Sequence, residues 1–312
     1  MRLDVILPTY NRHRLLEKAL NSLLAAEVPR GLDVRVSVID NNSKDNTRQV
    51  VEAKFKDFGG RLNYIFEGRQ GKSQALNTGI ESTNGDLVGM IDDDEEIDRG
   101  WYRRIQSAFT ENNTDFIGGP YLPRWSVEPP RWLPRDYPAV IGWIDGGDKV
   151  QVFGKDYPGM LMGGNAVLTR AILEKVGPYS TALGPVGDRF LAGEDDDMYR
   201  RLLAVGAHGL YLPDLIIYHH IPPERLTKSY YRHWCFWCGV SLGLIDRERP
   251  QQVVYLAGVP RYLYGRAARG LLGAMKQLLS KDEDPAKSFS NELAVWDLAG
   301  FFYGKHIYKS AG

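Results

Sequence analysis

The stretch that organises this chain lies at residues 87–96 and reads LVGMIDDDEE. A short apolar run, typical of a buried strand, ends here in five consecutive carboxylates. Side chains alternate between the faces of a strand, so Asp92 and Asp94 are expected to point the same way. Carboxylates this close repel one another unless a cation lies between them. The stretch therefore predicts a site for Mg²⁺ or Mn²⁺, which prefer oxygen ligands and bind phosphates. For Glu95 and Glu96 we prefer a solvated acidic loop, the usual fate of a charge run.

The composition is that of an ordinary globular protein. The 312 residues include 39 basic and 39 acidic ones, and this balance argues against a general nucleic-acid-binding protein. Cys235 and Cys238 form a C-x-x-C without the second pair that a zinc site needs, so we expect two buried apolar side chains. The N-terminus leads directly into a strand without a signal peptide, and no long apolar run predicts a spanning helix. We therefore expect a cytoplasmic protein.

Strand and helix patterns alternate through the first third of the chain. Strands are predicted at residues 3–7, 34–39, 62–66 and 87–91, and helices at 12–24 (with Asn11 as N-cap), 43–58, 72–82 and 101–109. This alternation predicts an α/β fold with a parallel sheet wound by right-handed crossovers. In such a sheet, ligands bind at the carboxyl ends of the strands.

Four polar clusters are expected to meet at those strand ends, namely residues 8–12, 40–43, 69–72 and 92–94. Their chemistry suits a nucleotide. Asp40 is suited to accept a hydrogen bond from a base or ribose, and Tyr10 to stack on the base. Arg69 and Lys72 supply positive charge for phosphate, and Gly71 lets the backbone approach closely. The chain has no P-loop motif, and no G-x-G-x-x-G follows its first strand, so neither of those nucleotide sites is expected.

Four motifs follow one another in the first half of the chain. They are LPTYNR at residues 7–12, IDNNS at 39–43 with Asp45 and Thr47 after it, GKSQALN at 71–77, and DDD at 92–94. Their order and spacing resemble those of the family 2 glycosyltransferases of the GT-A fold, and the resemblance continues to about residue 245. It implies a mostly parallel mixed sheet flanked by helices, a nucleotide-diphosphate sugar donor, a divalent cation (Mn²⁺ or Mg²⁺) on the DDD triplet, and inversion at the anomeric carbon.

The resemblance also implies roles for single residues. Contacts to the nucleotide are implied for Pro8, Tyr10, Asp40, Lys72 and Asp92. Asp94 is implied as the metal ligand, with Asp92 beside it and Asp93 on the ribose. The same crevice adds Thr9, Arg12 and Arg69 to the expected donor-binding set. The segment GGNAVL at 163–168 resembles the part of the family that lines the donor sugar, which adds Asn165.

A second acidic cluster, GEDDD at residues 193–197, opens a predicted helix. Acidic residues in a first helical turn also favour the helix dipole, which is the plain alternative. Glycosyl transfer needs a base that takes the proton of the acceptor hydroxyl. In the family that this chain resembles, the E-D pair at this position has that role. We therefore predict Asp195 as the base and Glu194 as the group that orients acceptor or base, with Asp197 as a rival.

Two adjacent histidines follow the strand predicted at residues 210–217. Imidazole accepts Mn²⁺, so a histidine near the acidic cluster would complete the metal site. Alternation along a strand sends only one of the two toward the crevice. We favour His220 over His219 as the third metal ligand, and this stretch resembles a bacterial branch of the family.

The rest of the chain changes character. Residues 120–160 are rich in Pro, Trp and Tyr, and we expect mostly loop, whose aromatic side chains stack on sugars or anchor the loop. Residues 250–281 carry five basic residues, no acidic one and many Leu and Tyr. Such an amphipathic helix lies on an anionic membrane or packs on the catalytic domain. A last apolar helix at 289–308 would contact a membrane or a second copy in a homodimer.

These expectations combine into one hypothesis. Residues 1–245 form a catalytic domain, with a nucleotide-binding half at 1–118 and an acceptor half at 119–245, and residues 246–312 form a helical extension. The enzyme would transfer a sugar, UDP-linked by preference, to a glycan or lipid-linked acceptor in cell-envelope polysaccharide synthesis, at the inner face of the plasma membrane. One rival is a sugar nucleotidyltransferase, which would carry a Gly-rich basic loop where Thr9 and Tyr10 stand. The other is a non-catalytic membrane-peripheral protein, against which the intact acidic clusters argue.

Overall fold

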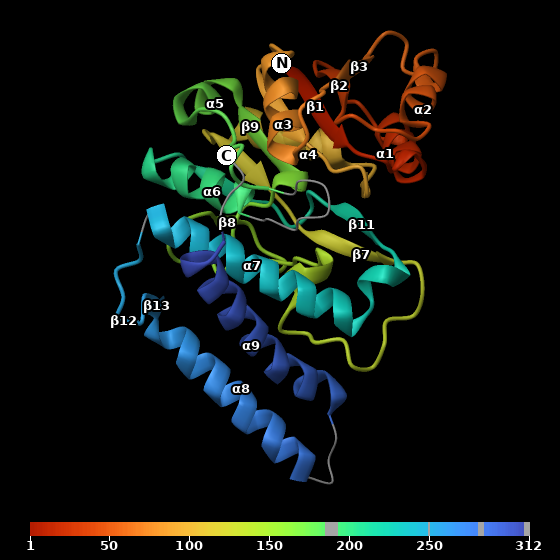
Figure 1. Ribbon diagram of the computed structural model, residues 1–312. Helices are drawn as coiled ribbons and strands as arrows, with labels where there is room; N and C mark the ends of the chain where they lie inside the picture. Colours follow the sequence, from red (N-terminus) through yellow and green to blue (C-terminus); the bar gives the residue numbers. More distant parts are fainter. Residues whose placement is uncertain (185–192, 249, 280–283, 309–312) are drawn as a thin grey trace. The chain divides into compact units, whose positions relative to one another are not determined.

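The chain forms two compact units, which are described separately. Figure 1 shows the computed structural model, which describes residues 1–184, 193–248, 250–279 and 284–308. The first unit comprises Met1–Arg124, Trp143–Thr181 and Glu194–His220, and the second comprises Trp125–Gly142, Ala182–Gly193 and Ile221–Gly312. The helix that contains residue 245, Lys228–Glu248, therefore groups with the C-terminal helices. A functional division at residue 245 stays a prediction.

An eight-stranded sheet forms the centre of the first unit, in the order β3-β2-β1-β4-β9-β6-β10-β8. Four parallel strands occupy one side: β1 (Arg2–Thr9), β2 (Asp33–Asp40), β3 (Leu62–Phe66) and β4 (Leu87–Met90). The other side of the sheet contains both parallel and antiparallel pairs. There, β9 (Ala166–Thr169) runs antiparallel to β4 and to β6 (Phe116–Gly118). Next to β6, β10 (Gly209–Tyr211) is parallel to it, and β8 (Gln151–Val152) is antiparallel to β10. The predicted α/β fold with a mostly parallel mixed sheet is confirmed.

Helices cover both faces of this sheet. One core cluster joins it to α1 (His13–Ala25), α2 (Thr47–Lys54) and α4 (Trp101–Glu111), and another joins it to α3 (Lys72–Glu81), α5 (Arg170–Val176) and α6 (Glu194–Ala204). The helix α1 forms because Leu16, Ala19, Leu20 and Leu23 recur at helical spacing and are all buried. It begins later than predicted: Asn11 is not its cap but takes a left-handed φ of 53° and accepts a hydrogen bond from Lys44 N at 2.7 Å.

A small sheet, in the order β5-β11-β7, extends from the acidic stretch. Its strands are β5 (Glu95–Ile97), β7 (Tyr121–Trp125) and β11 (Ile217–Ile221), so the single strand predicted at residues 210–217 is the end of β10 and the start of β11. The expectation of a solvated loop at Glu95 is wrong. Glu95 is 2% exposed, and its Oε2 accepts a hydrogen bond from Asp92 N at 2.8 Å, which ties the strand to the aspartate triplet.

The aromatic middle region is mostly loop, as predicted. Besides β7 and β8 it contains the 3₁₀ turn Pro138–Ile141, and two more such turns follow later at Gly163–Asn165 and Pro223–Arg225. Trp132 belongs to the second unit and packs edge-on against Tyr231 and Phe289, at ring-centroid distances of 5.7 and 5.1 Å. For Trp132, therefore, the structure shows an anchor in a core.

Three long helices form most of the second unit: α7 (Lys228–Glu248), α8 (Arg261–Leu279) and α9 (Pro285–His306), with a hairpin of β12 (Tyr255–Leu256) and β13 (Val259–Pro260) before α8 (Figure 1). Glycines let α7 and α9 approach closely. A Cβ at Gly300 or Gly304 would clash with the backbone of Phe236 or Val240 in α7. The last helix therefore uses its small-residue face within the chain.

Other features of the second unit answer sequence predictions. The α9 helix is capped by Asp284, whose side chain accepts from the backbone of Ala286 and Lys287. Cys235 is buried and Cys238 half-buried, as expected of apolar packing residues. None of the helices in the described ranges is both long and apolar enough to cross a membrane.

Candidate functional site

The predicted strand ends do converge. Thr9, the last residue of β1, is in register with Asp40 at the end of β2. The backbone hydrogen bonds continue past both ends, from Asn41 N to Thr9 O and from Glu67 N to Asp40 O, each 2.9 Å long. On the other side, Ile91 N donates to Ile6 O, which brings the aspartate triplet to the same edge. Parallel pairing thus builds one site from residues as far apart in sequence as Thr9 and Asp93, which are separated by 84 positions.

Residues at the end of β1 and just before α1 hold the aspartate triplet in place. Thr9 Oγ1 donates to Asp93 Oδ2 at 2.8 Å. Nη1 of Arg12 lies 3.1 Å from Asp93 Oδ1 and also 3.1 Å from Asp94 Oδ2. Burial raises the pKa of Asp93 to about 6, although the charge of Arg12 opposes this shift. In this structure Thr9 and Arg12, which we expected on the donor, contact the aspartates.

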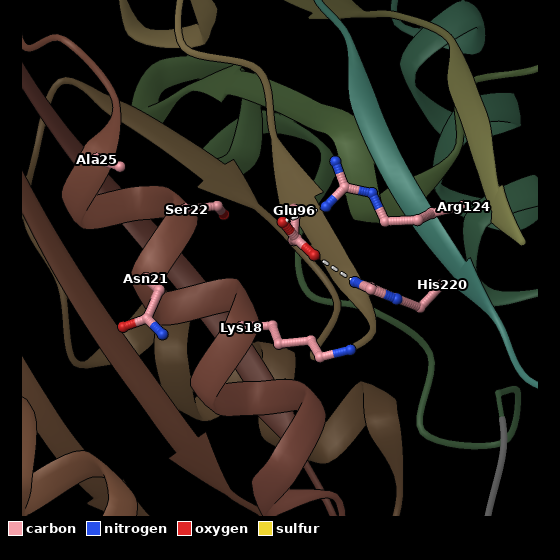
Figure 2. A pocket seen from close by; sticks show the side chains of 7 residues that line it. All are labelled: Lys18, Asn21, Ser22, Ala25, Glu96, Arg124 and His220. Carbon is pink, nitrogen blue, oxygen red and sulfur yellow. Dashed lines mark hydrogen bonds and ion pairs between the residues drawn. The ribbon is translucent and has the colours of Figure 1, made fainter. Parts of the chain in front are cut away.

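The two histidines of β11 point to opposite sides. The sequence favoured His220 for the position beside the aspartate triplet, but His219 lies there. Nε2 of His219 lies 3.4 Å from Asp94 Oδ2, and both side chains are almost fully buried. His220 instead pairs with Glu96, which also binds Arg124 at 2.6 Å. Figure 2 shows His220 and Arg124 on one side of Glu96 in a pocket of about 490 Å³, whose opposite wall is α1. Alternation along the strand correctly predicted that only one of the two histidines faces the aspartate triplet. The register of β11 shows that this residue is His219.

A divalent cation is implied by the family, and Asp94 and His219 are the residues that fit one. A buried carboxylate beside an imidazole is a donor pair that Mn²⁺ accepts. The Arg12 guanidinium against Asp94 shows that this carboxylate already attracts a positive charge. Within the part of the chain that the structure describes, no three His, Cys, Asp or Glu side chains form a metal-binding group. A cation here would therefore take further ligands from a bound diphosphate.

Hydrogen bonds around Asp40 hold the side of the site that is predicted to bind the nucleotide. Asp40 Oδ1 accepts from Ser43 N at 2.8 Å, and Asp40 Oδ2 accepts from Tyr64 OH at 2.6 Å. Asn41 fixes the next loop, because its Oδ1 accepts from Gly71 N at 2.8 Å and its Nδ2 donates to Arg69 O at 2.7 Å. Gly71 has a φ of 136°, which favours glycine there.

Two cations and one ring were predicted for this side. Arg69 is paired with Glu67 at 2.8 Å, yet 68% of its side chain remains exposed, so it can still meet a phosphate. Tyr10 is 40% exposed and free to stack, whereas Pro8 is buried at the end of β1. Sequence reasoning did not assign roles to Asn41 and Glu67. The signal was present for Asn41, which lies inside the IDNNS motif.

Lys72 joins the two acidic clusters. Its Nζ lies 2.8 Å from Asp92 Oδ2 and 3.8 Å from Glu194 Oε1. Burial works against the charge of Lys72, but Asp92, then Asp195 and Glu194, raise its pKa well above the ordinary value. Residues about 100 positions apart therefore share one ammonium group. The structure brings DDD and GEDDD to the same place, as the hypothesis requires.

Asp195 has the character of a base. Its Oδ1 is buried and has no hydrogen-bond partner among the described residues. A Cβ at Gly163 would clash with this oxygen, so a glycine is needed beside it. Burial raises the pKa of Asp195, and burial together with Asp195 raises the pKa of Glu194 to about 7. Asp197, the rival, forms an ion pair with Arg201 one turn along α6, at 2.9 Å.

Asn165 has a different position from the one expected. Its side chain is fully buried. Its Nδ2 donates to Leu215 O at 2.7 Å, and its Oδ1 accepts from Trp101 Nε1 at 2.9 Å. The structure therefore assigns Asn165 to the core, where it links three segments. Tyr121 was missed by the sequence: its buried hydroxyl has no partner among the described residues, and burial, followed by the charges of Glu95 and Asp195, raises its pKa.

Comparison with known proteins agrees with this geometry. Residues 4–177 match the family model of glycosyl transferase family 2, and the chain belongs to this family. Two relatives cover most of it: the glucosyl-dolichyl phosphate glucuronosyltransferase of Haloferax volcanii, 26% identical over 80% of this chain and 79% of its own length, and the succinoglycan biosynthesis protein ExoM of Rhizobium meliloti, 24% identical over 80% and 76%.

A solved structure shows the same fold. It is that of the mannosyltransferase PcManGT from Pyrobaculum calidifontis in complex with GDP-Man and Mn²⁺, with a TM-score of 0.66 and 20% identity over 98% of this chain and 88% of that one. The predicted family, the GT-A fold with its helical C-terminal region, and the glycosyltransferase activity are confirmed. Membership of this family also decides against the nucleotidyltransferase and non-catalytic alternatives.

Proposed function

We propose that this glycosyltransferase is metal-dependent and inverting, and that it moves a sugar from a nucleotide-diphosphate donor, UDP-linked by preference, to a hydroxyl of a glycan or lipid-linked acceptor. The observation that carries the proposal is the contact of Lys72 with both Asp92 and Glu194. Asp92, which we assign to the donor, and Glu194, which we assign to the side of the base, both lie beside the ammonium group of Lys72. A direct displacement needs both groups at one reaction centre.

Donor binding rests on the strand ends. Tyr10 stacks on the base, Asp40 accepts a hydrogen bond from the nucleoside, and Arg69 and Lys72 face the diphosphate. Because Tyr64 and Ser43 hold Asp40, this acceptor is oriented before the nucleotide arrives. Preorganisation of this kind lowers the entropy cost of binding.

Asp94 and His219 would hold the Mn²⁺ or Mg²⁺ ion, with Asp92 nearby and His220 no longer in the ligand set. When bound, the cation supplies Lewis-acid stabilisation of the charge that develops on the leaving diphosphate. Arg12 forms ion pairs with Asp93 and Asp94, and its charge compensates these two buried carboxylates. Lys72 adds a second positive charge on the side of Asp92.

Asp195 takes the proton from the acceptor hydroxyl, which attacks the anomeric carbon opposite to the leaving nucleotide. Inversion follows from a single displacement. A carboxylate whose pKa is raised by burial is a stronger base than a solvated one. Glu194 shares the site and orients the acceptor or the base. The first relative's name, which contains a dolichyl phosphate, supports a lipid-linked acceptor.

The test has two arms. A thermal-shift screen of nucleotide sugars with and without Mn²⁺ should give its largest metal-dependent shift with the true donor, because ligand binding stabilises the native state. Asp195→Asn should keep that shift and lower transfer at least about 100-fold. The matched control is Asp197→Asn, which weakens the ion pair with Arg201 and should retain transfer. Full transfer by Asp195→Asn would contradict the proposal.

A further inference from the structure

The helix α8 carries two apolar stripes, although a surface helix normally has one. The inner stripe contains Leu263 and Ala267, which are 6% and 4% exposed. Leu263 packs in a cluster with Val259 and Phe301, so this stripe is covered by α9. The outer stripe contains Leu271, Leu272 and Met275, which are 54%, 59% and 60% exposed. At about 100° per residue they lie within one third of the helix circumference, in a sector that begins about 40° from Ala267.

A second group of exposed apolar side chains lies in the segment that precedes α8. Val254 and Leu256 are 68% and 58% exposed, and Val253 is 42% exposed. Arg261 N, at the start of α8, donates to Val254 O at 2.8 Å, so this segment is attached to the first turn of the helix. We call Leu271, Leu272 and Met275 the outer apolar face. Large exposed apolar surfaces mark contacts with other molecules or with membranes.

The charge beside this face has one sign. No acidic residue occurs from Arg261 to Leu279. Arg269 and Lys276 are exposed next to the outer stripe, and neither forms an ion pair within the described ranges. The carboxylates that α9 contributes nearby are already paired, Asp297 with Arg266 and Glu292 with Arg232. The charged residues of α8 itself are therefore all positive.

We propose that the outer apolar face, with Arg269 and Lys276, is a docking surface for an anionic lipid bilayer. Apolar side chains enter the headgroup boundary, and the cations bind lipid phosphates. The charge argues against a second copy of the chain, because a symmetric contact would bring like charges together. The helix would lie on the bilayer, in keeping with the finding that no described helix could span one. This goes beyond the proposed transfer reaction and does not depend on which sugar is moved.

Vesicle co-sedimentation of the full chain tests the proposal without any measurement of transfer. We expect binding to vesicles that contain phosphatidylglycerol, weak binding to phosphatidylcholine alone, and loss of binding in high salt. The double variant Leu271→Gln, Met275→Gln should bind at least tenfold more weakly. Arg269→Gln, Lys276→Gln should weaken binding about 25-fold, at about fivefold per charge near the surface, and should reduce the dependence on lipid charge.

Matched controls come from the first unit. Val150 is 60% exposed, so Val150→Gln removes an equally exposed apolar side chain, and Lys56→Gln, Lys149→Gln removes two exposed cations. These variants should bind vesicles like the parent chain. Unchanged binding by the α8 variants would overturn the proposal, and so would equal binding to neutral vesicles. A dimer in light scattering that the Leu271→Gln, Met275→Gln variant abolishes would overturn it in favour of a second copy.

Discussion

Nε2 of His219 lies 3.4 Å from Oδ2 of Asp94, while the next residue, His220, turns to Glu96 on the other face of β11. Backbone pairing enforces the difference, because His219 is in register with Glu95 of β5 and His220 N donates to Asp94 O at 2.8 Å. The strand therefore presents one imidazole to the aspartate triplet and the other to the pocket of Figure 2.

We expect His219→Ala to weaken Mn²⁺-dependent nucleotide binding about 10- to 100-fold, the usual effect of losing a group that supports a metal. His220→Ala is the matched control and should change this affinity less than about threefold. Isothermal titration of each variant with nucleotide, in the presence and absence of Mn²⁺, measures both. The reverse order of effects would restore His220 as the ligand.

The pH dependence of transfer should report the buried pair Glu194 and Asp195. The base must be ionised, and burial raises the pKa of Asp195, so the rate should rise with pH above the range in which an ordinary carboxyl ionises. In Glu194→Gln the rising limb should move to lower pH, because one of the two carboxyls that share the site is gone. A profile of kcat between pH 5 and 9 checks this, and an unchanged limb would contradict it.

The same pair should also make the stability of the fold depend on pH, and stability should fall where the transfer rate rises. A carboxyl whose pKa is raised on folding stabilises the native state below its unfolded pKa, and this stabilisation is lost as pH rises through the folded pKa. For Glu194 the window runs from about 4.5 to about 7. Urea unfolding should show that Glu194→Gln loses less stability than the parent chain across this window. A parallel loss in both proteins would argue against a buried Glu194.

Asn165 should matter for stability more than for donor binding. Asn165→Ala leaves the buried Trp101 Nε1 and Leu215 O without their partner, at about 1–3 kcal/mol for each unsatisfied group. The exposed Asn63→Ala on β3 is the control and should cost less than about 0.5 kcal/mol. Urea unfolding measures both. A large rise in KM for the donor without loss of stability would return Asn165 to the donor site.

The contact of α7 with α9 should tolerate no side chain at Gly300. Gly300→Ala would clash with the Phe236 carbonyl, and overpacking of this kind costs about 1–3 kcal/mol. Gly265→Ala in α8 is the matched control. Its Cβ would meet only the flexible end of Arg269 at 3.4 Å, so the higher helix propensity of alanine should stabilise the chain by about 0.5–1 kcal/mol. Equal Tm values for the two variants would contradict the close contact.

Much of the fold and part of the site follow from local sequence pattern. The alternation of apolar strands and amphipathic helices determined the parallel half of the sheet, and strand direction determined that Thr9, Asp40 and the aspartate triplet meet at one edge. Polar residues that close buried strands have few other places to go. The acidic stretch at residues 92–94 was therefore identifiable as a site before any tertiary contact was known.

Tertiary structure alone decided the pairings. His219 was selected over His220 by the register of β11, and Glu95 became a buried strand residue because β11 pairs with β5. Asn165 proved to be a core cross-link, and Lys72 proved to bridge two clusters that lie far apart in the chain. These are contacts between distant segments, and their choice depends on packing and register to within one residue. Local periodicity carries no information about them, because a shift of one residue turns a strand side chain to the opposite face.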